Sequence, residues 1–452
     1  MLFKNHKKII DNGQTHELKN ARKDILEILT YAINAVDPYK TVKSKFNGEK
    51  IIIQSKIINI TDFENVYLIG FGKASVSMAQ AVCDSIVIKK GIVITNDSNK
   101  KVKSSRIITH VGDHPITSQN SIKGTNEILD MVKNCNENDL LIVLISGGGS
   151  ALFSKPRTSL KDIQKTTDLL LKSGANINEI NTIRKHISFV KGGQLVDFVK
   201  CQIISLIISD IVNDPIEFIA SGPTYPDSTT FLDAKNILKK YKLWKKIPLS
   251  VRNLIDDGIS KKISETPKKD NPIFNRVTNF IIANNEIACR AAEEKAKKLN
   301  YKTMLLTTSL EGEAKDIGKF LVEKAINYTT EKKKLLFIAG GETTVTIKGD
   351  GKGGRNQEMV LGSVYELSNK DVVFSSFATD GIDGISKAAG AIADGYTFSK
   401  AQRRNIDYKN YLINNNSYEY FNKLNDLLIT GPTGNNVMDI QIIIKLNKNN
   451  IY

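Results

Sequence analysis

The feature that most constrains the fold is an alternation of short apolar runs with longer amphipathic segments along the chain. Several short runs are apolar nearly throughout, as strands buried on both faces of a sheet are. We expect strands at Val66–Gly70, Gly91–Thr95, Arg106–His110, Leu140–Ser146, Ile203–Ser209, Phe280–Ala283, Thr303–Thr308, Leu335–Gly340, Thr343–Lys348, Val372–Ala378 and Val437–Ile444. Between them, helix periodicity predicts helices such as Leu18–Val36, Lys73–Val87, Asn120–Lys133, Asn178–Val199, Asn285–Leu299 and Gly312–Tyr328. This alternation predicts an α/β fold with mostly parallel sheet.

The length of the chain predicts more than one domain, because 452 residues exceed what a single hydrophobic core holds. The segment Lys261–Asn275 is polar and carries Pro267 and Pro272. Such a composition is typical of a boundary between domains. We therefore expect an N-terminal domain over residues 1–268 and a C-terminal domain over 275–452.

The formal net charge of +16 raises the question of a nucleic-acid partner. The lysines are spread along the whole chain, which favours a solvated surface and an attraction for anionic small molecules. No apolar run approaches the ~20 residues of a membrane helix, and the N-terminus lacks the pattern of a signal peptide. The four cysteines stand singly, as in a reducing compartment. We expect a cytoplasmic protein without nucleic-acid or membrane partners, and homo-oligomerisation stays open.

Glycine-rich turns follow several of the expected strands, where the ligands of open α/β sheets bind. In the first turn, GFGKAS, Lys73 opens a helix directly after two glycines, a pattern that favours an anion. The string is neither a Walker A loop nor a complete dinucleotide fingerprint. The second turn, SGGGS, offers backbone amides that can cradle phosphates. Its residues are Ser146, Gly147, Gly148, Gly149 and Ser150.

Aspartates follow two further strands. Asp210 comes directly after a strand, and Asp380 lies in the turn ATDGIDG after another. Carboxylates at strand ends can hold Mg²⁺ or accept the proton of a hydroxyl group, although turn capping is a common alternative. A small-residue turn with Gly222 lies close after Asp210 in the sequence. We add it to the candidates for phosphate binding.

The richest loop contains GGE, with Glu342, and then GDGKGGRNQE. Here Arg355 begins a helix and is followed by Asn356 and Gln357. A guanidinium group in that place can bind a carboxylate or a phosphate through two parallel hydrogen bonds. The glycines before it make a loop that can fold over a ligand.

These turns occur in a familiar order. GFGKAS, SGGGSAL, INTIRKHISFVKGGQL, IASGPT, GGETTV, GKGGRNQE, ATDGIDG and TGPTGNN together resemble the glycerate 2-kinases, the glycerate kinases with a C-terminal MOFRL domain. The resemblance spans about residues 20 to 445. It implies an N-terminal Rossmann-like parallel sheet with flanking helices, a C-terminal α/β MOFRL-type domain and an active site in the cleft between the domains. It also implies ATP-dependent phosphorylation of D-glycerate, most often to 2-phosphoglycerate.

By the same resemblance, Lys73 and Arg355 match positions regarded as active-site residues. We expect Lys73, Arg355 and Asp210 to be catalytic, and the SGGGS loop with Gly222 to bind nucleotide phosphates. Glu342, Asn356, Gln357 and Asp380 are candidates for contacts with the substrate, and Asp210 and Asp380 for a divalent cation such as Mg²⁺. His114 and His186 are possible bases. Gln194 stands where the family usually has arginine, which bears on substrate preference.

Three other activities stay open at this stage. One is phosphorylation of a related hydroxy acid or of the 3-hydroxyl group. Another is a nucleotide-dependent enzyme that is not a kinase, such as a hydroxy-acid dehydrogenase. The third is nucleic-acid binding driven by the positive charge, for which steep salt dependence would be the sign.

Overall fold

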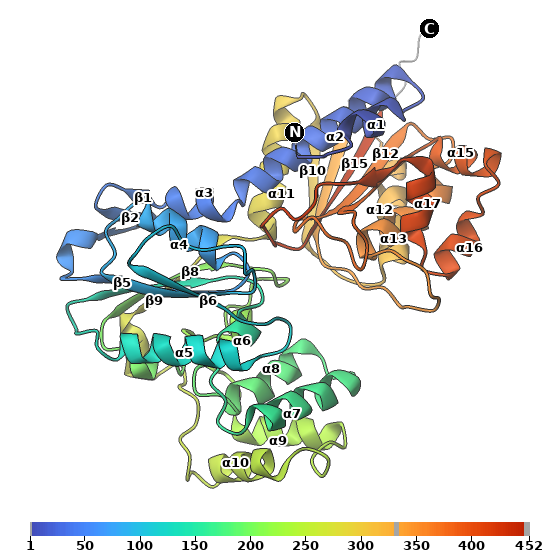
Figure 1. Cartoon of the computed structure of the whole chain (residues 1–452). Coiled ribbons are helices and arrows are strands. Elements are labelled where there is room, and N and C mark those ends of the chain that lie inside the picture. The colour runs from blue at the N-terminus through green and yellow to red at the C-terminus, as the bar shows by residue number, and fades with distance from the viewer. Residues whose placement is uncertain (1, 330–333, 447–452) are drawn as a thin grey trace. The chain divides into compact units, whose positions relative to one another are not determined.

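The computed structural model describes residues 2–329 and 334–446 of the chain. These residues form two compact units, and the sequence-based boundary does not separate them. The parallel-sheet unit contains Pro38–Ser209 and Asp214–Ile282. The mixed-sheet unit contains the described residues of Met1–Asp37, Asp210–Asn213 and Ala283–Tyr452. Both units combine a sheet with helices, so the predicted α/β class is confirmed (Figure 1).

The parallel-sheet unit is built on a six-stranded sheet with the order β6-β5-β4-β7-β8-β9. The strands are β4 (Val66–Phe71), β5 (Lys90–Thr95), β6 (Ile107–Val111), β7 (Leu140–Ile145), β8 (Gln202–Ile208) and β9 (Val277–Ala283). From β6 to β8 all neighbours pair in parallel, so the predicted parallel sheet is confirmed here. A small antiparallel sheet, absent from the sequence-based prediction, contains β1 (Phe46–Asn47), β2 (Lys50–Ile53) and β3 (Lys56–Asn59).

Helices cover this sheet and form a group of their own at one end of the unit. They are α3 (Pro38–Lys43), α4 (Ser75–Cys83), α5 (Gln119–Val132), α6 (Gly149–Leu152), α7 (Leu160–Lys172), α8 (Ile177–His186), α9 (Phe231–Lys240) and α10 (Leu249–Ile259). Helices α7 to α10 share a buried cluster of apolar side chains (Figure 1). The prediction of one helix over Asn178–Val199 was wrong. Helix α8 ends at His186, and Gly192 and Gly193 adopt positive φ angles that a right-handed helix excludes.

The mixed-sheet unit holds a second six-stranded sheet, with the order β10-β11-β15-β12-β13-β14. Its strands are β10 (Lys302–Leu310), β11 (Lys334–Gly341), β12 (Val372–Ala378), β13 (Gly390–Asp394), β14 (Leu427–Leu428) and β15 (Asp439–Leu446). Among the described strands of this sheet, β10 and β11 alone pair in parallel, so the prediction of mostly parallel sheet was wrong for this unit. The predicted strand Thr343–Lys348 is also absent, because this segment makes only an isolated bridge between Thr344 and Glu313.

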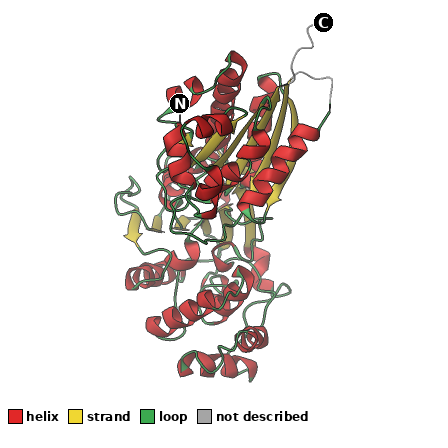
Figure 2. Ribbon diagram, turned by 90° about the vertical axis from the view of Figure 1, so that its right-hand side faces the viewer, coloured by secondary structure: helices red, strands yellow, loops and turns green. Residues whose placement is uncertain are grey.

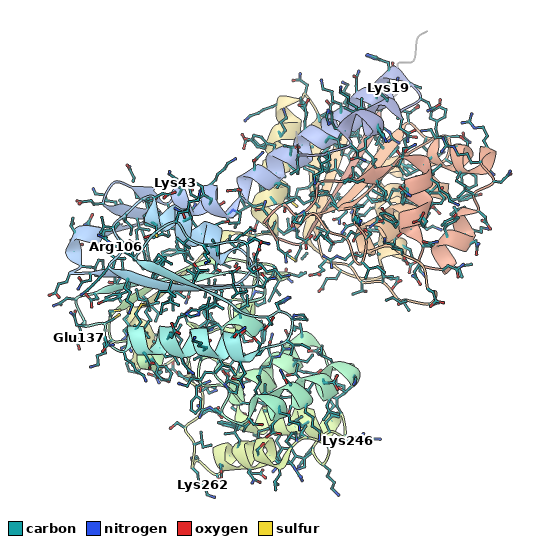
Figure 3. All side chains as sticks on the ribbon, viewed as in Figure 1. Lys19, Lys43, Arg106, Glu137, Lys246 and Lys262 are labelled. Atoms are coloured by element: carbon teal, nitrogen blue, oxygen red, sulfur yellow. The ribbon has the colours of Figure 1, made fainter. Side chains whose placement is uncertain are left out.

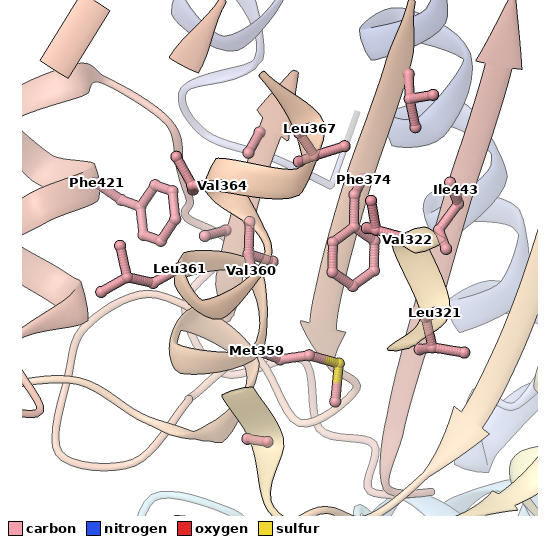
Figure 4. Close-up of a cluster of buried hydrophobic side chains, with 14 of the residues drawn as sticks. Leu321, Val322, Met359, Val360, Leu361, Val364, Leu367, Phe374, Phe421 and Ile443 are labelled. Carbon is pink, nitrogen blue, oxygen red and sulfur yellow. The ribbon is translucent and has the colours of Figure 1, made fainter. Parts of the chain in front are cut away.

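Helices cover both faces of the mixed sheet, as Figures 1 and 2 show. They are α1 (His6–Asp11), α2 (His16–Ala35), α11 (Asn285–Lys298), α12 (Ala314–Asn327), α13 (Arg355–Gly362), α14 (Val364–Leu367), α15 (Thr397–Arg403), α16 (Tyr408–Ile413) and α17 (Ser417–Leu424). Met359, Val360 and Leu361 of α13 pack into a core with Phe374 of β12 and Ile443 of β15 (Figure 4). This packing fixes α13, the helix that begins with Arg355.

Two sets of contacts explain why the units divide the chain differently from the sequence-based domains. Helix α2 belongs to the mixed-sheet unit, where Arg22 is fully buried and pairs with Asp394 at 2.7 Å and Asp426 at 2.6 Å. A polar segment expected to be a linker instead packs on the parallel-sheet unit. There Thr266 Oγ1 donates to Asp227 Oδ2 at 2.9 Å, and Asp227 N donates to the carbonyl of Pro267 at 3.0 Å.

The surface charge is dispersed. Figure 3 shows Lys43, Arg106, Glu137, Lys246 and Lys262 projecting from different elements of the parallel-sheet unit. All five are exposed. No helix within residues 2–329 and 334–446 is both long enough and apolar enough to cross a membrane.

Candidate functional site

Two predicted loops lock together at the end of the parallel sheet. After β4 the chain turns through Gly72, whose φ is +122° and where a Cβ atom would lie 2.3 Å from Ser146 Oγ. A side chain at this position therefore has no room. Lys73 N donates to the carbonyl of Gly147 at 2.9 Å, and Ala74 N donates to Ser146 Oγ at 3.1 Å. The exposed side chain of Lys73 leaves the backbone at this junction.

Several backbone amides of the SGGGS loop have no acceptor within the described residues. Gly149 N donates to the carbonyl of Ser146 at 3.2 Å, but the amides of Gly147, Gly148 and Ser150 form no hydrogen bond within the described part of the chain. Unsatisfied amides that follow one another in a turn can bind an anion. The hydroxyl groups of the loop serve the fold instead: Ser146 Oγ accepts from Ala74, and Ser150 Oγ pairs with Ser221 Oγ at 2.9 Å.

Basic side chains surround this loop. Partial burial and the charges of Lys73 and Arg184 lower the pKa of His114. Lys191 is 4% exposed, and its Nζ donates to the carbonyls of Ser150 at 2.6 Å and Phe153 at 2.9 Å. Burial, with a contribution from Arg184, lowers the pKa of Lys191 to about 7. Bound negative charge would relieve this crowding of cations.

Other predicted residues of this unit support the fold. Gly222 uses its amide to reach the carbonyl of Ile219 at 2.9 Å, and its own carbonyl accepts from Gly193 N at 2.7 Å. The fully buried ring of His186 bonds to Glu265 at 2.9 Å. Gln194 accepts from Arg157 at 2.6 Å.

In the mixed-sheet unit, Arg355 begins α13 and is held by two carboxylates. Its Nε and Nη2 donate to Asp439 at 2.5 and 3.0 Å, and its Nη1 pairs with Glu342 at 2.7 Å. These two carboxylates raise the pKa of Arg355, although burial works against them. The bidentate contact expected for a ligand is therefore made to Asp439, the first residue of β15, whose side chain is 1% exposed. Three of the five N–H donors of a guanidinium group are engaged.

Carboxylates gather around this arginine. Burial and the charges of Asp439, Asp210 and Asp380 raise the pKa of Glu342, against the effect of Arg355. The structure thus brings the predicted residues Asp210, Asp380, Glu342 and Arg355 together in one unit. Asp380 Oδ1 also accepts from Ile382 N at 2.9 Å, the turn contact that the sequence left open. Within the described ranges, no three His, Cys, Asp or Glu side chains are arranged to hold a metal ion.

Asn356 and Gln357 are fully buried and face into the protein. Their backbone amides donate to Asp383 at 3.1 and 2.8 Å, and their side-chain amides bond to the same carboxylate. A Cβ atom on Gly354 would lie 2.4 Å from this carboxyl group, so glycine is needed for its approach to the helix. Burial raises the pKa of Asp383 to about 6. These residues fix the start of α13, where Arg355 lies.

Sequence reasoning did not assign functional positions to Asp439, Asp383, Arg184 and Lys191. Asp383, Arg184 and Lys191 each stand inside a motif quoted for the family resemblance, and Asp439 lies in the expected strand Val437–Ile444. The sequence signal for Asp439 is a single acidic residue at the start of an apolar strand. For Arg184 and Lys191 it is a pair of cations flanking the apolar part of RKHISFVK. From these patterns alone, the partners of the three residues cannot be predicted. Only the fold shows which groups they contact.

The geometry defines a class of protein: an α/β protein with a glycine-rich turn of unbonded amides in one unit and an arginine held by carboxylates in the other. Residues 24–256 match a domain of unknown function, DUF4147, and residues 335–439 match the MOFRL family. Glycerate 2-kinase of Pyrococcus horikoshii is 45% identical over 94% of this chain and 97% of its own length. D-glycerate 2-kinase of Thermotoga maritima is 38% identical over 94% and 98%.

The solved structure of a glycerate kinase from Thermotoga maritima matches with a TM-score of 0.84 and 37% identity. The match covers 95% of this chain and all of that one. The chain belongs to the glycerate 2-kinase family, so the resemblance predicted from the motifs is confirmed.

Proposed function

We propose that this chain transfers the terminal phosphoryl group of ATP to the 2-hydroxyl group of D-glycerate, giving 2-phosphoglycerate and ADP. The observation that carries the proposal is near-full-length similarity to relatives named glycerate 2-kinase, at 38–45% identity. The geometry of the two loop clusters agrees with this reaction, because phosphoryl transfer needs anion binding and charge neutralisation more than covalent catalysis.

In the parallel-sheet unit, we assign the free amides of Gly147, Gly148 and Ser150 to the phosphates of the nucleotide. Lys73 leaves the same junction and, in this proposal, neutralises charge on the transferring phosphoryl group. In this proposal Gly222 supports the site, because its carbonyl accepts from Gly193 N next to the turn that carries Ser221.

In the mixed-sheet unit, we assign the reacting hydroxyl group to the carboxylates around Arg355. The hydroxyl oxygen forms a bond to the terminal phosphorus, the bond from that phosphorus to the bridging oxygen breaks, and ADP leaves. The hydroxyl proton passes to a carboxylate, for which Asp210 is our candidate. Arg355, fixed by Asp439 and Glu342, keeps N–H donors for an anionic oxygen of the substrate.

A divalent cation fits this donor set, because hard cations such as Mg²⁺ prefer carboxylate oxygens. Asp210 and Asp380 would hold it, and it would supply positive charge to the phosphates. Mg²⁺ usually keeps several waters and takes only one or two protein carboxylates besides the phosphates of a substrate. Two aspartates near Glu342 are thus an adequate set.

The experiment that tests the function is incubation with ATP, Mg²⁺ and D-glycerate, with the product identified by ³¹P and ¹H NMR. We expect a phosphoryl group on the oxygen of carbon 2. Phosphate on carbon 3, or reaction only with another hydroxy acid, would correct the regiochemistry or the substrate. No transfer, together with oxidation of glycerate when a nicotinamide nucleotide is supplied, would replace the kinase by a dehydrogenase.

We also propose that the reaction takes place in the cytoplasm, without a nucleic-acid partner. All four cysteines are free, which suits a reducing compartment. Exposed lysines such as Lys43, Lys246 and Lys262 lie on separate segments of the chain (Figure 3), which favours a solvated surface.

A further inference from the structure

Arg184 lies on the face of α8 that is turned toward the SGGGS loop. One helical turn before it, Asn181 Oδ1 accepts from Ser221 Oγ at 3.1 Å, and Ser221 Oγ pairs with Ser150 Oγ at 2.9 Å. Residues three positions apart share a helix face. The chain of hydrogen bonds from Asn181 to Ser150 therefore places Arg184 beside the loop whose amides are free.

Arg184 also differs from its neighbour on the same helix. Lys185 is fully buried, and its Nζ forms ion pairs with Glu217 at 2.6 Å and with Asp227 at 3.0 Å. Arg184 forms no ion pair within the described ranges, and burial alone lowers its pKa. A mostly buried guanidinium group without a counter-charge is costly.

The groups around Arg184 add to this cost. The charge of Arg184 lowers the pKa of both His114 and Lys191, and the charge of Lys73 also lowers the pKa of His114. The turn that carries Ser221 is itself strained, because Ala220 and Ser221 have φ angles of +51° and +62°. Strained backbone and crowded cations are both found where a ligand supplies the missing interactions.

We propose that Arg184 binds an oxyanion at the SGGGS loop, through the two parallel hydrogen bonds that a guanidinium group forms with a phosphate or a carboxylate. The oxyanion is a phosphoryl group of the nucleotide or the carboxylate of the hydroxy acid. The choice of the nucleotide and the hydroxy acid as the two possible sources of the oxyanion rests on the proposed function. The binding of an anion by Arg184 rests on its position beside the loop and on its missing partner.

The test compares Arg184→Met and Arg184→Lys with the wild-type chain. Lys165→Met on α7 is the matched control, because it removes one exposed positive charge outside the loop. Each variant is titrated by calorimetry with inorganic tripolyphosphate and with D-glycerate, and KM is measured for ATP and for glycerate. Thermal unfolding checks that each variant folds, and Arg184→Lys preserves the charge should Arg184→Met not fold.

We expect Arg184→Met to weaken one ligand by roughly ten- to a hundred-fold, Arg184→Lys to weaken it less, and Lys165→Met to have no effect. Loss of tripolyphosphate binding with a raised KM for ATP identifies a phosphoryl group. Loss of glycerate binding with a raised KM for glycerate identifies the carboxylate. If the Arg184 variants bind both ligands as the wild type does and have unchanged KM values for ATP and glycerate, the proposal is overturned. A fall in kcat alone would not rescue it.

The proposed function can fail separately. A wild-type chain that transfers no phosphoryl group to glycerate, but binds tripolyphosphate only with Arg184 in place, would refute the kinase and keep the anion site. A working kinase whose Arg184 variants bind both ligands normally would refute the site and keep the kinase.

Discussion

The two loop clusters of the molecule carry opposite charge. Around the SGGGS loop of the parallel-sheet unit stand Lys73, His114, Arg184 and Lys191, and the structure pairs Arg184 with no carboxylate in the described residues. In the mixed-sheet unit, Asp439 and Glu342 pair with the guanidinium group of Arg355. Asp210 and Asp380 add further negative charge near Glu342. Basic groups such as Arg184, which has no carboxylate partner in the described residues, suit a phosphate, whereas a group of carboxylates suits a proton or a metal ion.

This difference suggests a division of the reaction between the clusters. In the proposed reaction, the first cluster would bind the groups that are already anionic, and the second would prepare the hydroxyl group that attacks. The following predictions test that division, from the largest expected effect to the smallest.

Lys73→Ala should have the largest effect on turnover. If Lys73 neutralises charge that develops on the phosphoryl group, kcat should fall by roughly a hundred-fold or more. The fold should persist, because the side chain is exposed. The measurement is kcat from steady-state kinetics. Lys90→Ala is the control variant, because Lys90 is an exposed lysine at the start of β5. Near-normal kcat in folded Lys73→Ala would remove this residue from the chemistry.

Arg355→Lys should come next. Lysine keeps the charge but cannot make the two parallel contacts with Asp439, so we expect kcat/KM to fall by roughly ten- to several-hundred-fold. Arg403→Lys, an exposed arginine of the same unit, is the control. Asp439→Asn should reduce the same kinetic parameter, and the double variant should lose less than the product of the two effects, because Asp439 acts through Arg355. Independent losses would contradict that role of Asp439.

Asp210→Asn and Asp380→Asn should raise the Mg²⁺ concentration needed for half-maximal activity, on the order of tenfold each. The reason is the loss of one negative oxygen donor from the set near Glu342. A titration of activity with Mg²⁺, beside the exposed control Asp316→Asn, measures the shift. An unchanged Mg²⁺ requirement with a lowered kcat would assign Asp210 to proton transfer alone.

Asp383→Asn should mainly change how the free energy of unfolding depends on pH. Because the pKa of Asp383 is raised to about 6 in the fold, the folded state binds more protons than the unfolded chain between about pH 4 and pH 6. Its contribution to the free energy of unfolding therefore falls as the pH rises through this window and is level above it. The difference in unfolding free energy between wild type and Asp383→Asn should follow this course. A difference that grows with pH would reverse the sign of our account.

Much of the fold could be predicted, because several strands of the parallel sheet are nearly all apolar, and glycine closely follows β4, β6 and β7. The antiparallel strands around β15 were harder to predict, because pairing direction leaves no mark on a buried apolar run such as Val372–Ala378. Placement of α2 in the mixed-sheet unit could not be predicted, because it depends on Arg22 reaching two aspartates far along the chain.

The candidate site could be predicted in its residue types but not in its partners. The glycine-rich motif indicated Arg355, and nothing local indicated that Asp439 would take its bidentate contact 84 positions away. In the same way, RNQE suggested polar contacts for a ligand, whereas the fold directs Asn356 and Gln357 to Asp383. Arg184 stood beside Lys185 as an equal cation, and only the structure shows that one is paired and the other is not.

The division of the reaction between the clusters is tested most directly by ATP binding without a divalent cation, measured by calorimetric titration of Lys73→Ala and Arg355→Lys. Without a metal ion, the carboxylates around Arg355 have no means of attracting phosphates. The account predicts that Lys73→Ala weakens ATP binding several-fold or more, while Arg355→Lys binds ATP as the wild type does. Normal ATP binding by Lys73→Ala, together with weakened binding by Arg355→Lys, would contradict it.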